Sequence, residues 1–319
     1  MDCMFDFAPM EGITDYSLRE THSARFPGVD RYYSPFIAAN QTRSFKTREK
    51  QDVAPEHNSG VVLVPQILTN HPEVFLWAAG QMLLRGWGTV NLNLGCPSAT
   101  VVTHGKGAGF LSDPDRLDAF FERVFDGAEK GACGGPVRIS VKTRIGVENT
   151  AEAASLLTVF SRYPLDELIV HPRLRKDFYQ GVPDLDIFEM FYEDYRGRLA
   201  YNGDIRSPED LRRILGRFPK LGRVMIGRGL IANPALVREL QGGPALTMHE
   251  LQAFHDELLV RRVEALQGFH NASGKMKELW YYFGELFPDR EKEIRKIKKA
   301  RSLMEYRAAA AAFFGDARG

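Results

Sequence analysis

The clearest indication of the fold class is the segment Val137–His171, which reads VRISVKTRIGVENTAEAASLLTVFSRYPLDELIVH. It begins with a β-rich run at Val137–Thr143 and ends with an apolar run at Glu167–His171, and an amphipathic stretch at Ala151–Arg162 lies between them. Short apolar runs of this kind are typical of buried parallel strands, and the amphipathic stretch is typical of a helix. The segment therefore predicts a strand, a helix and a second strand parallel to the first.

The same alternation extends over most of the chain. Six further strands are predicted at Met4–Met10, Arg31–Phe36, Val61–Leu68, Thr89–Leu94, Leu199–Asn202 and Val224–Ile226, and further helices at Pro72–Arg85, Pro114–Lys130 and Pro208–Arg217. Strands that alternate with helices favour a (β/α)8 TIM barrel. A doubly wound open sheet is the alternative that strand counting leaves open, although no G-x-G-x-x-G motif follows the first strand.

The strand pattern stops after Pro244, and the rest of the chain is predicted to be helical. Helices are expected at Met248–Leu266, Lys275–Phe287 and Arg290–Met304. Two glycines and a proline interrupt the pattern at residues 242–244. We therefore expect a barrel domain over residues 1–243 and a helical domain over residues 244–319.

The bulk properties exclude several classes of protein. The 319-residue chain has a net charge of +1, so any nucleic-acid-binding surface must be a local patch. We expect no membrane helix and no signal peptide, because the apolar runs are too short and the N-terminus lacks the signal pattern. Cys3, Cys96 and Cys133 are too few for a disulfide framework, which favours a cytoplasmic location. No metal-ligand spacing is present, so no metal is expected.

Polar residues and glycines follow nearly every predicted strand. In barrels, functional residues gather at the C-terminal ends of the strands. The candidates at these ends are Pro9, Met10, Glu11, Gln66, Asn93, Cys96, Lys142, His171, Arg173, Asn202, Gly203, Asp204, Gly227 and Arg228. Their shared position predicts a single site at this end of the barrel.

Two kinds of ligand group suit these candidates. Loops after the last two strands of barrels commonly bind phosphate, and Gly203, Gly227 and Arg228 suit that role; alternatively, the glycines only turn the chain. Inward-pointing Gln66 and Lys142 would be satisfied by a heterocycle with carbonyl and ring-nitrogen atoms, and a lysine can stabilise a reduced flavin. The alternative for Lys142 is an ion pair with a carboxylate.

Cys96 is the strongest single candidate for a catalytic residue. It lies in Gly95-Cys96-Pro97, directly after a predicted strand and before a glycine-rich segment. A free cysteine is usually a buried apolar residue, as we expect of Cys3 and Cys133, but one on a rim loop is better interpreted as an acid or a nucleophile. The same position favours a functional role for His171 over that of a structural core histidine.

Taken in order, these motifs resemble the tRNA-dihydrouridine synthase family. The stretches that carry the resemblance are APMEGITD at 8–15, NLGCP at 93–97, VKTRIG at 141–146, NGDI at 202–205 and IGRG at 226–229. The match runs from about residue 8 to residue 240, and KMKELWYY at 275–282 resembles the family's RNA-binding domain much less specifically.

The resemblance implies an enzyme that uses FMN and NADPH to reduce the C5=C6 bond of a uridine in tRNA. Hydride would reach C6 from the flavin, Cys96 would protonate C5, and Asn93 would face the uracil. Arg173 is also assigned to the substrate, although Pro172 and Leu174 beside it depart from the family's pattern. The residues that the resemblance assigns to the cofactor are Pro9, Met10, Glu11, Gln66, Lys142, His171, Asn202, Gly203, Asp204, Gly227 and Arg228.

A run of basic residues in the tail indicates which kind of molecule the protein binds. Arg290, Lys292, Arg295, Lys296, Lys298, Lys299 and Arg301 face only Glu291 and Glu293 in this span. The run suits a phosphate backbone, so Lys296, Lys298 and Lys299 are expected to contact tRNA; the alternative is a solvated helix face.

Two rival functions stay open. An FMN barrel reductase for a small pyrimidine would share the fold, but would not need the basic helical tail. A non-catalytic RNA-binding flavoprotein would not need Cys96. We expect tRNA and NADPH as partners and no obligate protein partner, and the sequence does not indicate which uridine is reduced.

Overall fold

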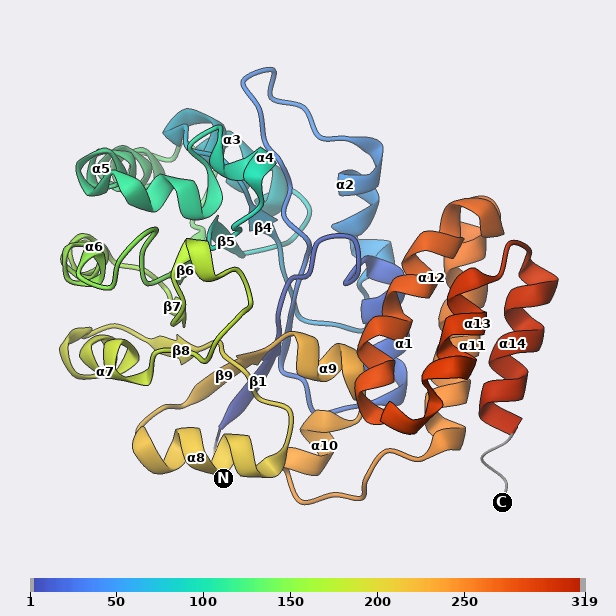
Figure 1. The fold of residues 1–319 in the computed structure, drawn as a ribbon. Helices are drawn as coiled ribbons and strands as arrows, with labels where there is room; N and C mark the ends of the chain where they lie inside the picture. The colour runs from blue at the N-terminus through green and yellow to red at the C-terminus, as the bar shows by residue number, and fades with distance from the viewer. Residues whose placement is uncertain (1–2, 316–319) are drawn as a thin grey trace.

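The computed structural model describes residues 3–315. Within them, parallel strands form one sheet in the order β3-β2-β1-β9-β8-β7-β6-β5-β4. The strands are β1 (Met4–Phe7), β2 (Arg31–Tyr33), β3 (Leu63–Val64), β4 (Gln66–Ile67), β5 (Thr89–Leu94), β6 (Arg138–Arg144), β7 (Leu168–His171), β8 (Leu199–Tyr201) and β9 (Arg223–Ile226). β3 and β4 are halves of one predicted strand, interrupted at Pro65, which has no N–H for the ladder. Both ends of the order thus lie on the same strand, and the sheet closes into the predicted barrel (Figure 1).

Helices surround the barrel. They are α1 (Tyr16–Arg25), α2 (Thr47–Asp52), α3 (Pro72–Leu83), α4 (Ala99–Val102), α5 (Pro114–Glu129), α6 (Glu152–Ser161), α7 (Leu185–Asp194), α8 (Pro208–Arg217), α9 (Arg228–Ala232) and α10 (Leu236–Leu240). Asp113 caps α5 and Ser207 caps α8 through side-chain oxygens, and a proline follows each cap. The helices predicted at residues 72–85, 114–130, 151–162 and 208–217 are confirmed.

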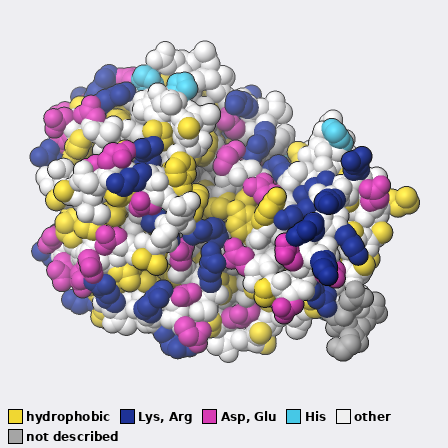
Figure 2. All heavy atoms as spheres, viewed as in Figure 1, with side chains coloured by type: hydrophobic (Ala, Val, Ile, Leu, Met, Phe, Trp, Pro, Cys, Tyr) yellow, Lys and Arg dark blue, Asp and Glu magenta, His cyan; other side chains and the backbone are white. Residues whose placement is uncertain are grey.

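The tail is helical, as predicted, but its last part differs from the prediction. It contains α11 (Met248–Ala265), α12 (Phe269–Phe283), α13 (Glu291–Lys299) and α14 (Leu303–Gly315). The single helix predicted over Arg290–Met304 is wrong, because the chain leaves the helical conformation at Ala300 (φ −54°, ψ 136°). The break lets α14 turn back and bury Phe313 and Phe314 against Trp280 of α12. Lys and Arg side chains gather over the tail in Figure 2.

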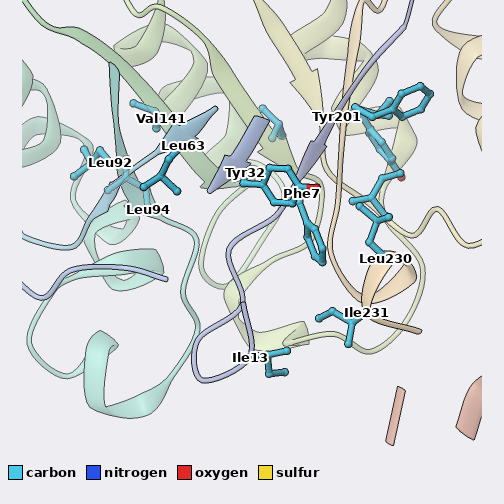
Figure 3. Close-up of a cluster of buried hydrophobic side chains, with 14 of the residues drawn as sticks. Phe7, Ile13, Tyr32, Leu63, Leu92, Leu94, Val141, Tyr201, Leu230 and Ile231 are labelled. Carbon is cyan, nitrogen blue, oxygen red and sulfur yellow. The ribbon is translucent and has the colours of Figure 1, made fainter. Parts of the chain in front are cut away.

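The core follows the alternation of side chains along each strand. Residues such as Phe7, Tyr32 and Leu92 lie in the large cluster between strands and helices, part of which Figure 3 shows. Ala8, directly after β1, and Tyr33, the last residue of β2, belong to a second cluster, as the period of two requires for side chains inside the barrel. Cys3 and Cys133 are buried in the large cluster, as predicted.

The tail packs onto the N-terminal part of the barrel. α11 contacts α1, and α12 contacts α9. Arg262 of α11 donates to the carbonyl oxygen of Ile13 (2.6 Å), and Lys275 of α12 donates to that of Gly12 (2.9 Å). Both also pair with the buried carboxylate of Asp15. The loop after β1 is therefore held by the tail. None of the helices in the described part of the chain has the length and apolar character needed to cross a membrane.

Candidate active site

Two adjoining cavities lie at the C-terminal ends of the strands. The larger, of about 610 Å³, is lined among others by Pro9, Met10, Glu11, Gln66, Asn93, Cys96 and Lys142. The smaller, of about 60 Å³, is lined among others by His171, Asn202, Gly203, Asp204, Gly227 and Arg228. Pro9, Met10, Gly95, Lys142 and Tyr179 line both. The structure thus brings together the residues predicted for the strand ends, with Arg173 as the exception described below.

A chain of buried amides fixes the wall of the larger cavity. Asn93 Oδ1 accepts hydrogen bonds from the backbone N–H groups of Gly95 (3.1 Å) and Cys96 (2.9 Å). Asn93 Nδ2 donates to Gln66 Oε1 (2.7 Å), and Gln66 Nε2 donates to Asn91 Oδ1 (2.8 Å). Asn91, which is not among the predicted site residues, is therefore a link in this network. Such a satisfied network orients each amide and holds the backbone of Cys96 in place.

Cys96 is half-buried on the wall of this cavity. Burial raises the pKa of its thiol, and the nearby negative charge of Glu11 acts in the same direction. The thiol therefore stays protonated at neutral pH, the form required of an acid. The Cys96 carbonyl accepts from the N–H of Ala108 (3.0 Å). Gly107 lies beside this contact at φ +55°, where a Cβ would come within 2.8 Å of the Cys96 oxygen, so only glycine fits.

Lys142 and His171 present polar groups that lack partners. Burial lowers the pKa of Lys142 to about 7, with Arg144 acting in the same direction, and no ion pair to Lys142 forms within the described residues. His171 Nδ1 lies 2.5 Å from the carbonyl oxygen of Asn202, which can only accept, so Nδ1 carries the proton. His171 Nε2 is buried and has no partner in the described part of the chain. Burial holds the pKa of His171 well below its usual value, so the ring is neutral and Nε2 is a free acceptor.

The smaller cavity is lined by groups that can bind an anion. Neither the N–H of Gly203 nor that of Gly227 donates to another of the described residues. Arg228, at the start of the short helix α9, pairs with Asp204 (2.5 Å) and lies against the ring of Tyr179, 5.1 Å from its centre. Asp204 itself cannot bind an anion, but its carboxylate orients Arg228. This is the place in a barrel where phosphate commonly binds.

Arg173 does not line either cavity. It is buried, pairs with Asp204 (2.6 Å), and donates to the carbonyl oxygens of Gln180 (3.1 Å) and Gly181 (2.7 Å). These bonds tie the loop after β7 to the barrel. Lys296, Lys298 and Lys299 lie on α13 in the tail, outside the linings of the two rim cavities.

Arg144 and Tyr179 belong to the site but are not among the predicted residues. Arg144 donates to the carbonyl oxygens of Gly95 (2.9 Å), Leu174 (2.7 Å) and Phe178 (2.6 Å), so it joins the Cys96 loop to the loop after β7. Tyr179 lies near both Arg144 and Arg228 and lines both cavities. Arg144 could have been predicted, because it comes directly after a predicted strand, where functional residues gather. Tyr179 could not have been predicted, because it lies in a loop whose sequence has no periodic pattern.

Glu278 and Tyr282 of the tail were also missed. Both line the larger cavity, although they come from α12. The cavity therefore lies between the barrel and the tail rather than within the barrel alone.

This chain is similar to known proteins both in sequence and in fold. The family model described as "Dihydrouridine synthase (Dus)" matches residues 6–311. A tRNA-dihydrouridine(16) synthase of Ralstonia nicotianae is 26% identical over 284 residues, covering 86% of this chain and 84% of the relative. A tRNA-dihydrouridine synthase B of Vibrio vulnificus is 26% identical, covering 82% of this chain and 80% of the relative. Among solved structures, morphinone reductase is similar in fold, with a TM-score of 0.53 and 14% identity over 76% of this chain and 87% of its own.

Proposed function

This chain belongs to the dihydrouridine synthase family, and we therefore propose that it uses FMN and NADPH to reduce the C5=C6 bond of a uridine in tRNA. It is a tRNA-dihydrouridine synthase, as its family and several relatives indicate. A cytoplasmic location would give it access to tRNA. When bound, FMN would supply the transfer of a hydride from NADPH to the uracil ring.

The residues of the two cavities fit this cofactor. Lys142, which has no carboxylate partner among residues 3–315, would donate to a ring carbonyl oxygen, and His171 Nε2 would accept from a hydroxyl or N–H group. Arg228 and the free N–H groups of Gly203 and Gly227 would bind a phosphate. Pro9, Met10 and Glu11, together with Gln66, line the larger cavity, where a flat ring would lie. Asn202 and Asp204 would act indirectly, by orienting His171 and Arg228.

The observation that carries the proposal is a half-buried thiol, Cys96, that lines the larger cavity together with Lys142, while the other unpaired groups line the smaller cavity that adjoins it. Hydride addition at C6 leaves negative charge at C5 and its neighbouring carbonyl, and Cys96 Sγ would then give its proton to C5. Asn93 holds the backbone of Cys96 and keeps one amide N–H for the uracil. The target base must leave its stack to reach this cavity.

Residues of the tail favour RNA over a small free pyrimidine as the substrate. Glu278 and Tyr282 form part of the cavity lining, so the mouth lies between barrel and tail. A small substrate would need no such second wall, whereas a nucleotide within tRNA has flanking nucleotides to hold. The relatives named for position 16 make that uridine the first to examine.

The decisive experiment maps dihydrouridine in individual tRNAs from a strain that lacks this gene. We expect at least one position to lose dihydrouridine, and wild-type protein to restore it whereas Cys96→Ala does not. The purified protein should be yellow and release about one FMN per chain. Unchanged dihydrouridine at every position, or a colourless protein that FMN cannot reconstitute, would overturn the proposal.

A further inference from the structure

A second groove lies on the tail and adjoins the active-site cavity. It has a volume of about 490 Å³ and is lined by Gly274, Lys277, Glu278, Tyr281 and Tyr282 of α12 and by Lys298 of α13. Glu278 and Tyr282 line the active-site cavity as well, so the two hollows meet at these side chains. Figure 2 shows the hollow between barrel and tail beside a group of Lys and Arg side chains.

Tyr281 is the unusual residue of this groove. Its neighbours Trp280 and Phe283 on α12 are fully buried, whereas Tyr281 is 66% exposed. The Lys298 ammonium lies 3.7 Å from the centre of the Tyr281 ring, which is cation–π geometry. Lys298 therefore covers part of the ring while most of it stays open to solvent. An exposed aromatic ring beside free positive charge is the combination that binds single-stranded nucleic acid.

The charges around the ring are arranged to suit one end of a nucleotide. Lys277 and Lys298 flank the groove, and neither forms an ion pair within the described residues. Glu278 is the one carboxylate in the lining of this groove, on the side that it shares with the active-site cavity. A carboxylate repels phosphate but can accept from the N–H groups of a base. Phosphate would therefore lie on the lysine side.

We propose that this groove holds a nucleotide next to the target uridine, with its base stacked on Tyr281 and its phosphate bound by Lys277 and Lys298. The inference rests on the proposed function, because it needs a uridine of tRNA in the adjoining cavity. The neighbours of an extruded uridine are joined to it by the backbone and therefore lie near the mouth of its cavity. At this mouth, Glu278 and Tyr282 line both the cavity and the groove that contains Tyr281. Stacking tolerates any base, so the groove would steady the RNA without reading its sequence.

The test measures binding of an unmodified tRNA transcript to the FMN-loaded enzyme at several salt concentrations. Tyr281→Ala should weaken binding about 5- to 150-fold, the range for loss of one base–aromatic stack, with an unchanged salt slope. Tyr281→Phe, which keeps the ring, should bind as wild type does. Lys298→Ala should reduce the slope of log affinity against log salt by about 0.7–0.9, which corresponds to one phosphate contact. The control is Leu84→Ala, which truncates a side chain that is 80% exposed on the barrel.

The possible outcomes separate this inference from the proposed function. The stacking role is overturned if Tyr281→Ala binds tRNA as tightly as the wild type does. It is also overturned if Tyr281→Phe loses as much affinity as Tyr281→Ala. Both conclusions hold even if the enzyme makes dihydrouridine normally. An unchanged salt slope in Lys298→Ala overturns the phosphate contact. If the wild type binds tRNA, responds to these variants as expected and makes no dihydrouridine, Tyr281 and Lys298 still bind RNA, but the proposed function is overturned and no target uridine lies beside them. Flavin reduction by NADPH and the melting temperature should be unchanged in Tyr281→Ala, which excludes misfolding.

Discussion

At the scale of single residues, Cys96 combines access to the cavity with a thiol that stays protonated. Its pKa is raised by burial and by Glu11, while its backbone is held by Asn93 and Ala108. A nucleophilic cysteine needs the opposite, a pKa lowered by neighbouring positive charge. The environment of Cys96 therefore favours the acid over the nucleophile among the two roles that the sequence left open.

We predict that Cys96→Ala folds, binds FMN and accepts electrons from NADPH, but reduces tRNA about 10²–10⁴-fold more slowly, the usual contribution of a general acid. Stopped-flow absorbance of the flavin separates the two half-reactions. Cys133→Ala is the matched control, because Cys133 is buried in the core away from both cavities. Reoxidation by tRNA at the wild-type rate in Cys96→Ala would show that another group donates the proton.

Lys142 gives a prediction that depends on pH. Burial lowers its pKa to about 7, and contact of its ammonium group with a bound flavin would raise that pKa. Cofactor binding above pH 7 would then take up a proton, so FMN affinity should fall as the pH rises above 7, by at most about tenfold per pH unit. Titrations of FMN fluorescence between pH 7 and 9 should show this slope in the wild type and a flat response in Lys142→Met. Equal slopes in both proteins would contradict the assignment.

At the scale of elements, α13 presents its lysines on two faces. Ile294 and Ile297 are buried, Lys296 and Lys299 are exposed, and Lys298 leans over Tyr281 of α12. The lysines of the basic run therefore do not form a single patch. The run is also more than a solvated helix face, because Lys298 lines a groove. This division follows from the period of the helix, which turns residues 296 and 299 to the same side.

We predict that reversal of Lys296 and Lys299 to Glu weakens tRNA binding and lowers its salt slope by about 0.7–0.9 for each phosphate that the protein no longer neutralises. Flavin reduction by NADPH should not change, because both residues lie outside the rim cavities. Reversal of Arg123 and Lys130 on the barrel, at α5 and directly after it, makes the same change in net charge and should have little effect. Equal losses of affinity in the two double variants would mean that only the net charge matters.

At the scale of the whole molecule, the barrel and the tail are joined through the loop that lines the cavity. Asp15 caps α1 through a hydrogen bond from the Leu18 N–H (3.1 Å) and pairs with Lys275 (2.6 Å) and Arg262 (3.3 Å) of the tail. Lys275 and Arg262 also hold the carbonyl oxygens of Gly12 and Ile13. Displacement of the tail would therefore disturb the loop that carries Met10 and Glu11. The division into domains at residue 243 stays a prediction.

The same contact predicts an acid dependence of stability. Burial alone would raise the pKa of Asp15, but the charges of Arg262 and Lys275 outweigh it and hold the pKa below its usual value. The stabilisation is thus present above the unfolded pKa of about 3.9 and is lost as the pH falls through the lower folded value. Asp15→Asn should lower the free energy of unfolding by about 3–5 kcal/mol at pH 7, since it breaks a buried ion pair. Urea unfolding at pH 7 and at pH 3 should show the difference shrink at the lower pH; a constant difference would contradict it.

The barrel strands, most helices around the barrel and nearly all of the residues that gather at the rim could be predicted from the sequence alone. Those features follow from local causes: apolar runs, helix caps such as Ser207, and polar residues placed where strands end. Parallel strands in a closed barrel then bring those ends together, so residues far apart in the chain meet without any further information.

The contacts of each side chain, by contrast, depend on the tertiary structure. Asn91 meets Gln66 across 25 residues, Tyr179 lies near Arg144 and Arg228, and Arg173 turns to its own loop rather than to the cavity. The helix break at Ala300 likewise serves the packing of Phe313 and Phe314 on Trp280. The physical reason is common to these cases. A polar or aromatic side chain takes the partner that packing brings within reach, and packing depends on every element of the fold at once.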